Sequence, residues 1–235
     1  MSYFITQEDV FSVQADTAVL GIENPVVPSS GPVFDRLAAA GGEPLLREMR
    51  KLRFLSVGRA AAVDPCGLPF QHLILSAAPR WQNGEANELT VLRICYQSIY
   101  TLAERLGVRR LAMPFLSIDY YRFPQREAIQ IAFAEASRRE LETVFLAETS
   151  AQYDICQQAK QKPRILSYIG HYRDHGVFEL SNGMFAFVDL RPEKNDVSLR
   201  AFYDSCYLAE TDPQRVPLPA EEVERLRSIY EASPW

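Results

Sequence analysis

Residues 113–124 read MPFLSIDYYRFP and join two segments of different character. The run from Arg110 to Met113 is short and apolar and stops at Pro114, a pattern that predicts a buried strand. Residues from Pro124 to Arg138 follow with helical periodicity and with proline in the first turn, a position that proline favours. The stretch is therefore predicted to be a loop that leaves the carboxyl end of a strand and enters a helix.

The same alternation of strands and helices runs through the first two-thirds of the chain. Glu88 to Leu106 has apolar residues near a 3.6-residue period, and Gly107 follows as a helix stop. The other predicted helices are Arg36 to Ala40, Glu43 to Lys51 (after a break at Gly41-Gly42), Pro124 to Arg138 and Ala151 to Lys160. The predicted strands are Thr17 to Leu20, Arg59 to Val63, His72 to Ser76, Arg110 to Met113 and Thr143 to Ala147.

Strands that alternate with helices predict an α/β fold, with a mostly parallel or mixed sheet covered by helices on both faces. Sheets of this kind bind ligands at the carboxyl ends of their strands. The loops after Leu20 and Met113 are therefore the expected ligand-binding region.

Composition narrows the function classes. The 235 residues carry a formal net charge of -5, which argues against nucleic acid as a direct electrostatic partner. A small anionic ligand remains compatible with this charge, because backbone N–H groups at a helix N-terminus can hold phosphate. No apolar run reaches the length needed to cross a bilayer, and the first residues lack a leader pattern, so no membrane partner is expected. The cysteines Cys66, Cys95, Cys156 and Cys206 are widely spaced, which favours reduced thiols and a cytoplasmic location.

Three stretches carry a family pattern in one order and spacing. Glu8 to Phe11 (EDVF) is followed by Asp16 to Val19 (DTAV), residues 24–37 read NPVVPSSGPVFDRL, and the third stretch is residues 113–124. Together they resemble the macrodomain family over about residues 5–160. The resemblance implies a three-layer α/β fold with a mixed sheet. It also implies ADP-ribose or a related nucleotide diphosphate as the ligand, with no cofactor.

The resemblance also implies roles for individual residues. The carboxylate of Asp9 accepts from the adenine amino group, which suits a group that only accepts hydrogen bonds, and the N–H of Val10 assists. Asn24 contacts the distal ribose if one residue is inserted after Asp16; without the insertion, Glu23 takes that position. The implied ligand-binding residues are Asp9, Val10, Asn24, Ser29, Ser30, Gly31, Val33, Phe34, Ser117, Ile118, Asp119, Tyr120, Tyr121 and Arg122.

The first ligand loop departs from the family pattern. The family has a run of glycines that lets the backbone approach a diphosphate at a helix N-terminus, and here the run is Ser29-Ser30-Gly31-Pro32. Pro32 has no N–H to donate. The aspartate that supports catalysis in hydrolytic members is replaced by Phe34, and the neighbouring Asp35 points elsewhere on a helix.

The second loop and the adenine side depart as well. Pro114, Ser117, Tyr121 and Pro124 fit the family pattern, but its two glycines are replaced by residues 119 and 122. An aspartate at 119 repels phosphate unless it turns outward, whereas an arginine at 122 attracts it. The position aligned with the aromatic that stacks on adenine is occupied by Glu148.

Three functions are compatible with these residues. Binding of ADP-ribose or a modified relative, as a reader or sensor, is favoured, and an ADP-ribosylated macromolecule is then a further partner. Hydrolysis of ADP-ribose from protein or nucleic acid comes second because Phe34 removes the usual carboxylate, so Asn24 and Asp35 are the remaining catalytic candidates. The third function is a protein-interaction module that has lost the ligand.

The remaining residues predict an extension to the main domain, with limits 1–162 for the domain and 163–235 for the extension. Val177 to Leu180 and Met184 to Leu190 flank Ser181-Asn182-Gly183, which predicts a β-hairpin. Val197 to Tyr207 and Glu221 to Glu231 are predicted helices.

His171 and His175 are four residues apart, a spacing that suits a metal on a helix. Gly170 and Gly176 flank them and no cysteine ligand is near, so a loop or turn is expected rather than a metal site.

Overall fold

The computed structural model describes residues 3–23, 27–28, 31–118, 122–181, 184–201 and 218–233. The chain divides into two compact units, Met1–Lys160 and Gln161–Trp235.

The first unit is built on a mixed sheet of seven strands. The strand order is β1-β7-β6-β2-β5-β4, and β3 pairs with β2 at the side. Neighbours from β1 to β5 run parallel, whereas β4 and β3 are antiparallel to their partners. The strands are β1 (Tyr3–Thr6), β2 (Thr17–Glu23), β3 (Val27–Pro28), β4 (Ala60–Val63), β5 (His72–Ala77), β6 (Arg110–Pro114) and β7 (Glu142–Leu146).

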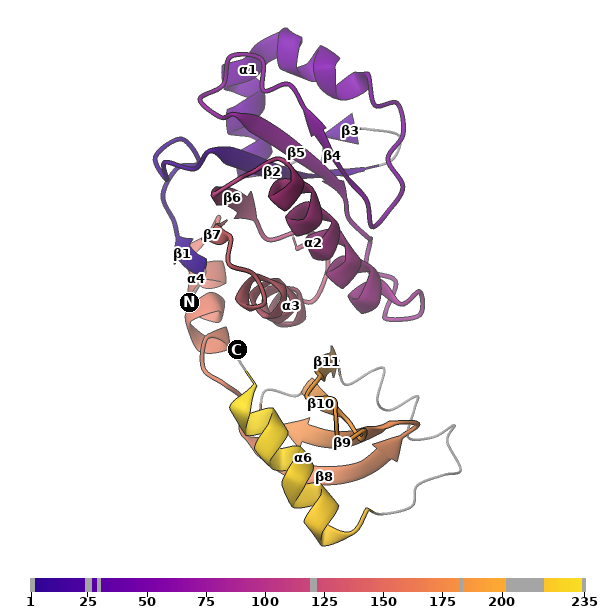
Figure 1. Ribbon diagram of the computed structural model, residues 1–235. Helices are drawn as coiled ribbons and strands as arrows, with labels where there is room; N and C mark the ends of the chain where they lie inside the picture. The colour runs from indigo at the N-terminus through magenta and orange to yellow at the C-terminus, as the bar shows by residue number, and fades with distance from the viewer. Residues whose placement is uncertain are drawn as a thin grey trace. The chain divides into compact units, whose positions relative to one another are not determined.

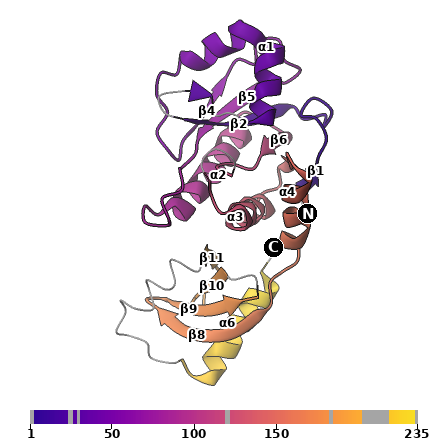
Figure 2. The same cartoon turned by 180° about the vertical axis from the view of Figure 1, so that it is seen from behind.

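Helices cover both faces of this sheet (Figures 1 and 2). The helices are α1 (Pro32–Arg50), α2 (Glu88–Arg105), α3 (Gln125–Ser137) and α4 (Ser150–Ala159). Val144 of β7 belongs to the core cluster that holds the buried face of α1. Its neighbour Thr143 points the opposite way and hydrogen-bonds Tyr100 of α2 at 3.1 Å. Because successive side chains of a strand face opposite sides, α1 and α2 lie on opposite faces. The predicted three-layer α/β fold is confirmed.

Helix α1 contains the break predicted from the glycine pair. Gly42 has a φ of 57°, in the left-handed region where glycine is favoured, so the helix kinks there. Gly41 is buried, and a Cβ at this position would come within 2.7 Å of Leu45 Cδ2. The pair therefore serves both the kink and close packing of the second half of the helix.

The second unit is a four-stranded antiparallel sheet with a helix on one face. The strand order is β11-β10-β9-β8, formed by β8 (Ile165–Tyr172), β9 (His175–Leu180), β10 (Met184–Asp189) and β11 (Val197–Ala201). Helix α6 (Ala220–Ala232) buries Leu226 and Tyr230 in a cluster with Phe178. The Tyr230 hydroxyl donates to the Pro163 carbonyl at 2.6 Å, which attaches the helix to the segment before β8.

The structure corrects one predicted helix in this unit. The hairpin of β9 and β10 is confirmed, and α6 matches the predicted last helix. Residues 197–201, however, form strand β11, and the rest of that prediction, residues 202–207, lies outside the described residues. Val197 and Leu199 are buried in the α6 cluster while Ser198 between them is not, so the local period is two rather than 3.6.

The segment with two histidines is also more regular than predicted. His171 is in β8 and His175 begins β9, and they flank a tight turn at Arg173-Asp174. Arg173 has a φ of 48°, which allows the turn to close. The expected turn is present between the two residues, but the histidines themselves are in paired strands.

Candidate functional site

The predicted ligand segments follow strands that end at one edge of the sheet. Strands β1, β7, β6 and β2 are parallel neighbours, so their carboxyl ends lie on the same side. The loops after them contain Asp9, Glu148, Ser117 and the start of α1. This edge is the binding edge of parallel sheets in general, and it is the candidate site here.

Asp9 attaches the loop after β1 to α1. One carboxylate oxygen accepts from the Phe11 N–H at 2.8 Å, and the other pairs with Arg36 Nη1 at 2.8 Å. The Asp9 and Arg36 side chains are 38% and 50% exposed, so this pair stabilises the fold by only about 0.2–1 kcal/mol. If adenine binds here, as the resemblance implies, its amino group has to share the carboxylate with Arg36 or displace it. The Val10 side chain is buried in the α1 core cluster, so only its backbone is available to a ligand.

The first turn of α1 is capped by a distant carboxylate. Gly31 precedes the helix and has no side chain to cap it, and Pro32 is the first helical residue. The Val33 N–H donates to Glu148 Oε1 at 3.0 Å across 115 positions of sequence. Free N–H groups and the helix dipole make this end of a helix attractive to anions, which explains why a carboxylate lies there.

The loop after β7 fixes where Glu148 lies. Thr149 caps α4 by accepting from the Gln152 N–H at 3.1 Å, and the Gln152 side chain accepts from the Glu148 N–H at 2.6 Å. This reciprocal pattern is a variant of the capping box. The backbone of Glu148 is thus positioned by α4, independently of its own carboxylate.

The position that the resemblance gives to the catalytic acid is occupied by Phe34, and Asp35 follows it. Phe34 is partly buried and packs against the α1 core cluster. Asp35 lies in the first turn of α1 with an exposed side chain.

The loop after β6 has strained residues and a buried hydroxyl. Ser117 has a φ of 66°, unusual for a residue with a side chain, and is only 7% exposed. Among the described residues its hydroxyl has no hydrogen-bond partner. The Phe123 N–H donates to the Ser117 carbonyl at 3.1 Å and closes the loop. Ile118 is buried, whereas Arg122 is exposed with a φ of 53°.

Two buried contacts that the sequence analysis missed support this loop. The Leu116 N–H donates to the Tyr96 hydroxyl at 3.0 Å, and burial raises the pKa of Tyr96. The rings of Trp81 and Phe123 lie 4.9 Å apart, which joins the loop after β5 to the loop after β6. The apolar period of α2 did not single out Tyr96, and no local pattern indicated its partner.

Six predicted ligand residues lie outside the described part of the chain. They are Asn24, Ser29, Ser30, Asp119, Tyr120 and Tyr121. Their roles stay predictions, as does the choice between Asn24 and Glu23, the last residue of β2.

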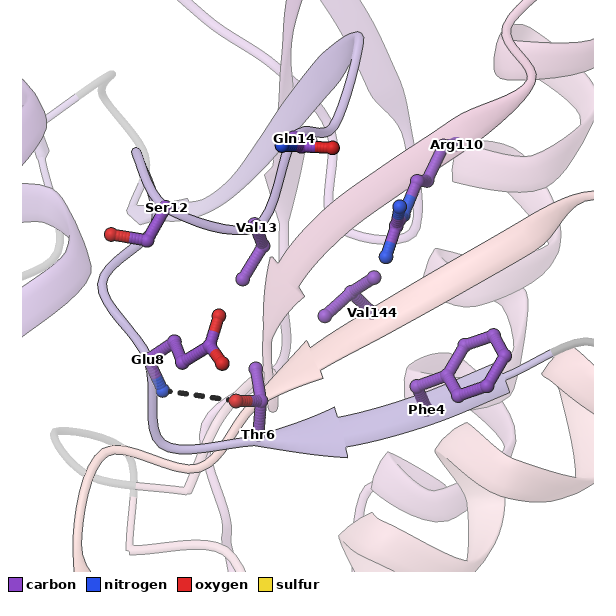
Figure 3. Close-up of a pocket in the computed structure, with 8 residues that line it drawn as sticks. All are labelled: Phe4, Thr6, Glu8, Ser12, Val13, Gln14, Arg110 and Val144. Atoms are coloured by element: carbon purple, nitrogen blue, oxygen red, sulfur yellow. Dashed lines mark hydrogen bonds between the residues drawn. The ribbon is translucent and has the colours of Figure 1, made fainter.

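A pocket of about 320 Å³ lies on the α1 face of the sheet, beneath the loop of residues 8–14 (Figure 3). It is lined by Phe4, Thr6, Glu8, Ser12, Val13, Gln14, Arg110 and Val144. The Glu8 N–H donates to Thr6 Oγ1 at 3.1 Å and holds the loop against β1. Glu8 adjoins Asp9 in sequence, but the lining includes none of the predicted ligand residues.

The described residues show no group of three or more His, Cys, Asp or Glu side chains placed to hold a metal ion. None of the helices described is long and apolar enough to span a bilayer.

Burial raises the pKa of both Cys95 and Cys156 to about 12, so these thiols stay protonated at neutral pH. Cys66 is partly exposed, and its pKa is also raised, by desolvation and then by Asp64.

Comparison with known proteins assigns the first unit to a family. Residues 23–132 match the profile described as Macro domain. A macro domain-containing protein of Mesorhizobium japonicum is 33% identical over 129 residues, which are 55% of this chain and 73% of that protein. The chain belongs to the macrodomain family. Another relative, named O-acetyl-ADP-ribose deacetylase 1, of Pantoea vagans, is 30% identical over 161 residues, which are 64% of this chain and 94% of that protein.

Solved macrodomain structures share the fold. The Oceanobacillus iheyensis macrodomain with ADP has a TM-score of 0.60 and 19% identity, covering 66% of this chain and 87% of that chain. The Trypanosoma brucei macrodomain in complex with ADP-ribose has a TM-score of 0.59 and 21% identity, covering 67% of this chain and 68% of that chain. At this identity the likeness is one of fold.

Proposed function

We propose that this macrodomain binds ADP-ribose or a related nucleotide diphosphate and acts as a reader or sensor of that group. The observation that carries the proposal is the first turn of α1, where the Val33 N–H already holds an anionic oxygen at 3.0 Å. The turn lies at the carboxyl edge of the parallel strands, where a diphosphate would meet the same N–H groups and helix dipole.

The loop after β6 supports the same ligand. The buried Ser117 hydroxyl offers a donor and an acceptor, and it has no partner in the described residues. Strained backbone of the kind seen at Ser117 and Arg122 is concentrated at ligand sites in proteins. Relatives of this fold have been solved with ADP and with ADP-ribose, which is in keeping with a nucleotide diphosphate here.

Hydrolysis of an ADP-ribose derivative is the second candidate, because a relative of 30% identity carries the name of a deacetylase. Phe34, which packs against the core cluster, speaks against hydrolysis, since this position has no carboxylate to activate water. Asn24 and Asp35 are the candidate catalytic residues, and loss of all turnover in Asp35→Ala would support this function.

Calorimetric titration with ADP-ribose tests the binding proposal. Micromolar binding is expected, and Asp9→Ala is expected to weaken it by removing the adenine acceptor. Asp9→Asn is the matched control for folding, because its side-chain oxygen can still accept from the Phe11 N–H. Absence of binding at millimolar ADP-ribose would refute the proposal and favour a protein-interaction module.

We further propose an ADP-ribosylated macromolecule as the wider partner and the cytoplasm as the location. The free thiols of Cys66, Cys95 and Cys156 are in keeping with a reducing compartment. We propose residues 1–162 as the ligand-binding domain and 163–235 as its extension, a division supported by the two compact units.

A further inference from the structure

The chain places a carboxylate of its own at the anion position of the candidate site. Glu148 Oε1 lies 3.0 Å from the Val33 nitrogen and 3.9 Å from the place of a Cβ on Gly31. Gly31 and Val33 belong to the loop that the family resemblance assigns to the diphosphate. The Glu148 backbone is held by Gln152, so the carboxylate is delivered to this point by the fold.

A diphosphate and this carboxylate compete for the same donor. Both are anions that accept from the first-turn N–H groups, and two anions at one helix N-terminus repel each other. A bound diphosphate must therefore move the Glu148 side chain away and break its bond to Val33.

We propose that Glu148 is a specificity-determining residue that lowers the affinity of the site for diphosphates by occupying the anion position at the start of α1. The inference rests on the proposed function. The penalty falls on the phosphate groups of the ligand, because the Glu148 carboxylate bonds the first turn of α1, although the family pattern aligns this position with the aromatic that stacks on adenine.

Glu148→Gln tests this with little risk to the fold, because the amide oxygen can still accept from Val33 while the charge is gone. Glu140→Gln is the matched control: Glu140 is exposed, precedes β7 at the opposite end, and loses the same charge. Each protein is titrated calorimetrically with ADP-ribose and with adenosine. The Val33 amide is also followed by ¹H–¹⁵N correlation NMR during titration with inorganic pyrophosphate.

Glu148→Gln is expected to bind ADP-ribose about tenfold more tightly than the wild type. A tenfold change is expected because the interaction of one charged group with a helix N-terminus has a free energy of this order. Adenosine binding and the Glu140→Gln variant are expected to be unchanged. Pyrophosphate is expected to shift the Val33 amide at lower concentration in Glu148→Gln than in the wild type.

The outcomes separate the two proposals. If the wild type binds ADP-ribose and Glu148→Gln binds it equally or more weakly, the role of Glu148 is refuted and the proposed function stands. If no protein binds ADP-ribose but pyrophosphate shifts Val33 more readily in Glu148→Gln, the proposed function fails and the anion competition stands. If none of the three proteins binds ADP-ribose and the Val33 amide responds to pyrophosphate equally in all three, the proposed function and the role of Glu148 are both refuted.

Discussion

Glu88→Gln is expected to destabilise the first unit because Glu88 holds the loop before α2. Glu88 is only 2% exposed. One oxygen accepts from the N–H groups of Gln82 at 2.6 Å and Gly84 at 3.2 Å, and the other from the Ala86 N–H at 2.9 Å. Three backbone donors thus depend on one buried side chain.

The expected size of the effect follows from these three bonds. Hydrogen bonds to a charged group stabilise a fold by about 1.5–3 kcal/mol each, against about 1 kcal/mol for a neutral pair. Glutamine keeps one neutral acceptor oxygen and presents an NH₂ group to the donors facing the other oxygen. Water at the exposed loop residues replaces part of the loss, so we expect the free energy of unfolding to fall by about 2–4 kcal/mol.

Urea unfolding followed by tryptophan fluorescence measures this. The chain has two tryptophans, so a Trp235→Phe background leaves Trp81, which adjoins the loop and packs on Phe123. Glu85→Gln is the control, since Glu85 is an exposed carboxylate in the same loop. If the free energy of unfolding falls by less than about 0.5 kcal/mol, or by no more than in the control, the three hydrogen bonds do not stabilise the fold as their geometry implies.

Two further predictions follow from buried polar groups. Tyr96→Phe leaves the buried Leu116 N–H without its acceptor, so we expect the free energy of unfolding, measured in urea, to fall by about 1–3 kcal/mol. Because Ser117 adjoins Leu116, ADP-ribose binding is also expected to weaken. An unchanged unfolding midpoint would contradict this prediction. Hydrogen bonds from Arg191 hold the pKa of Asp189 well below its usual value. The ionised carboxylate therefore stabilises the fold above about pH 3.9, the pKa of an unfolded aspartate, and this contribution is lost as the pH falls further. Asp189→Asn should therefore be less stable than the wild type at pH 7 but lose less stability between pH 7 and pH 3, as measured by urea unfolding at both; an identical pH dependence would exclude the role of this pair.

Local periodicity made most elements predictable. The long apolar stripe of α2, the break at Gly41-Gly42 and the hairpin of β9 and β10 depend on residues close in sequence, and each is present in the structure. Strand β11 was missed because five residues are too few to separate a period of two from a helical one. Its assignment depends on pairing with β10, a partner that is visible only after folding.

The sequence by itself determined the α/β class and most helices and strands of the first unit, and it predicted the loops that carry the candidate ligand residues. These follow from side-chain periodicity and from the chain reversals that glycine and proline permit. It also marked positions 34 and 148 as departures from the family pattern. Only the tertiary structure decided what those departures do: Phe34 packs, partly buried, against the core cluster, and Glu148 caps α1 across 115 positions of sequence. A contact between residues so far apart has no local signature, because it arises where the carboxyl ends of parallel strands bring separate loops together.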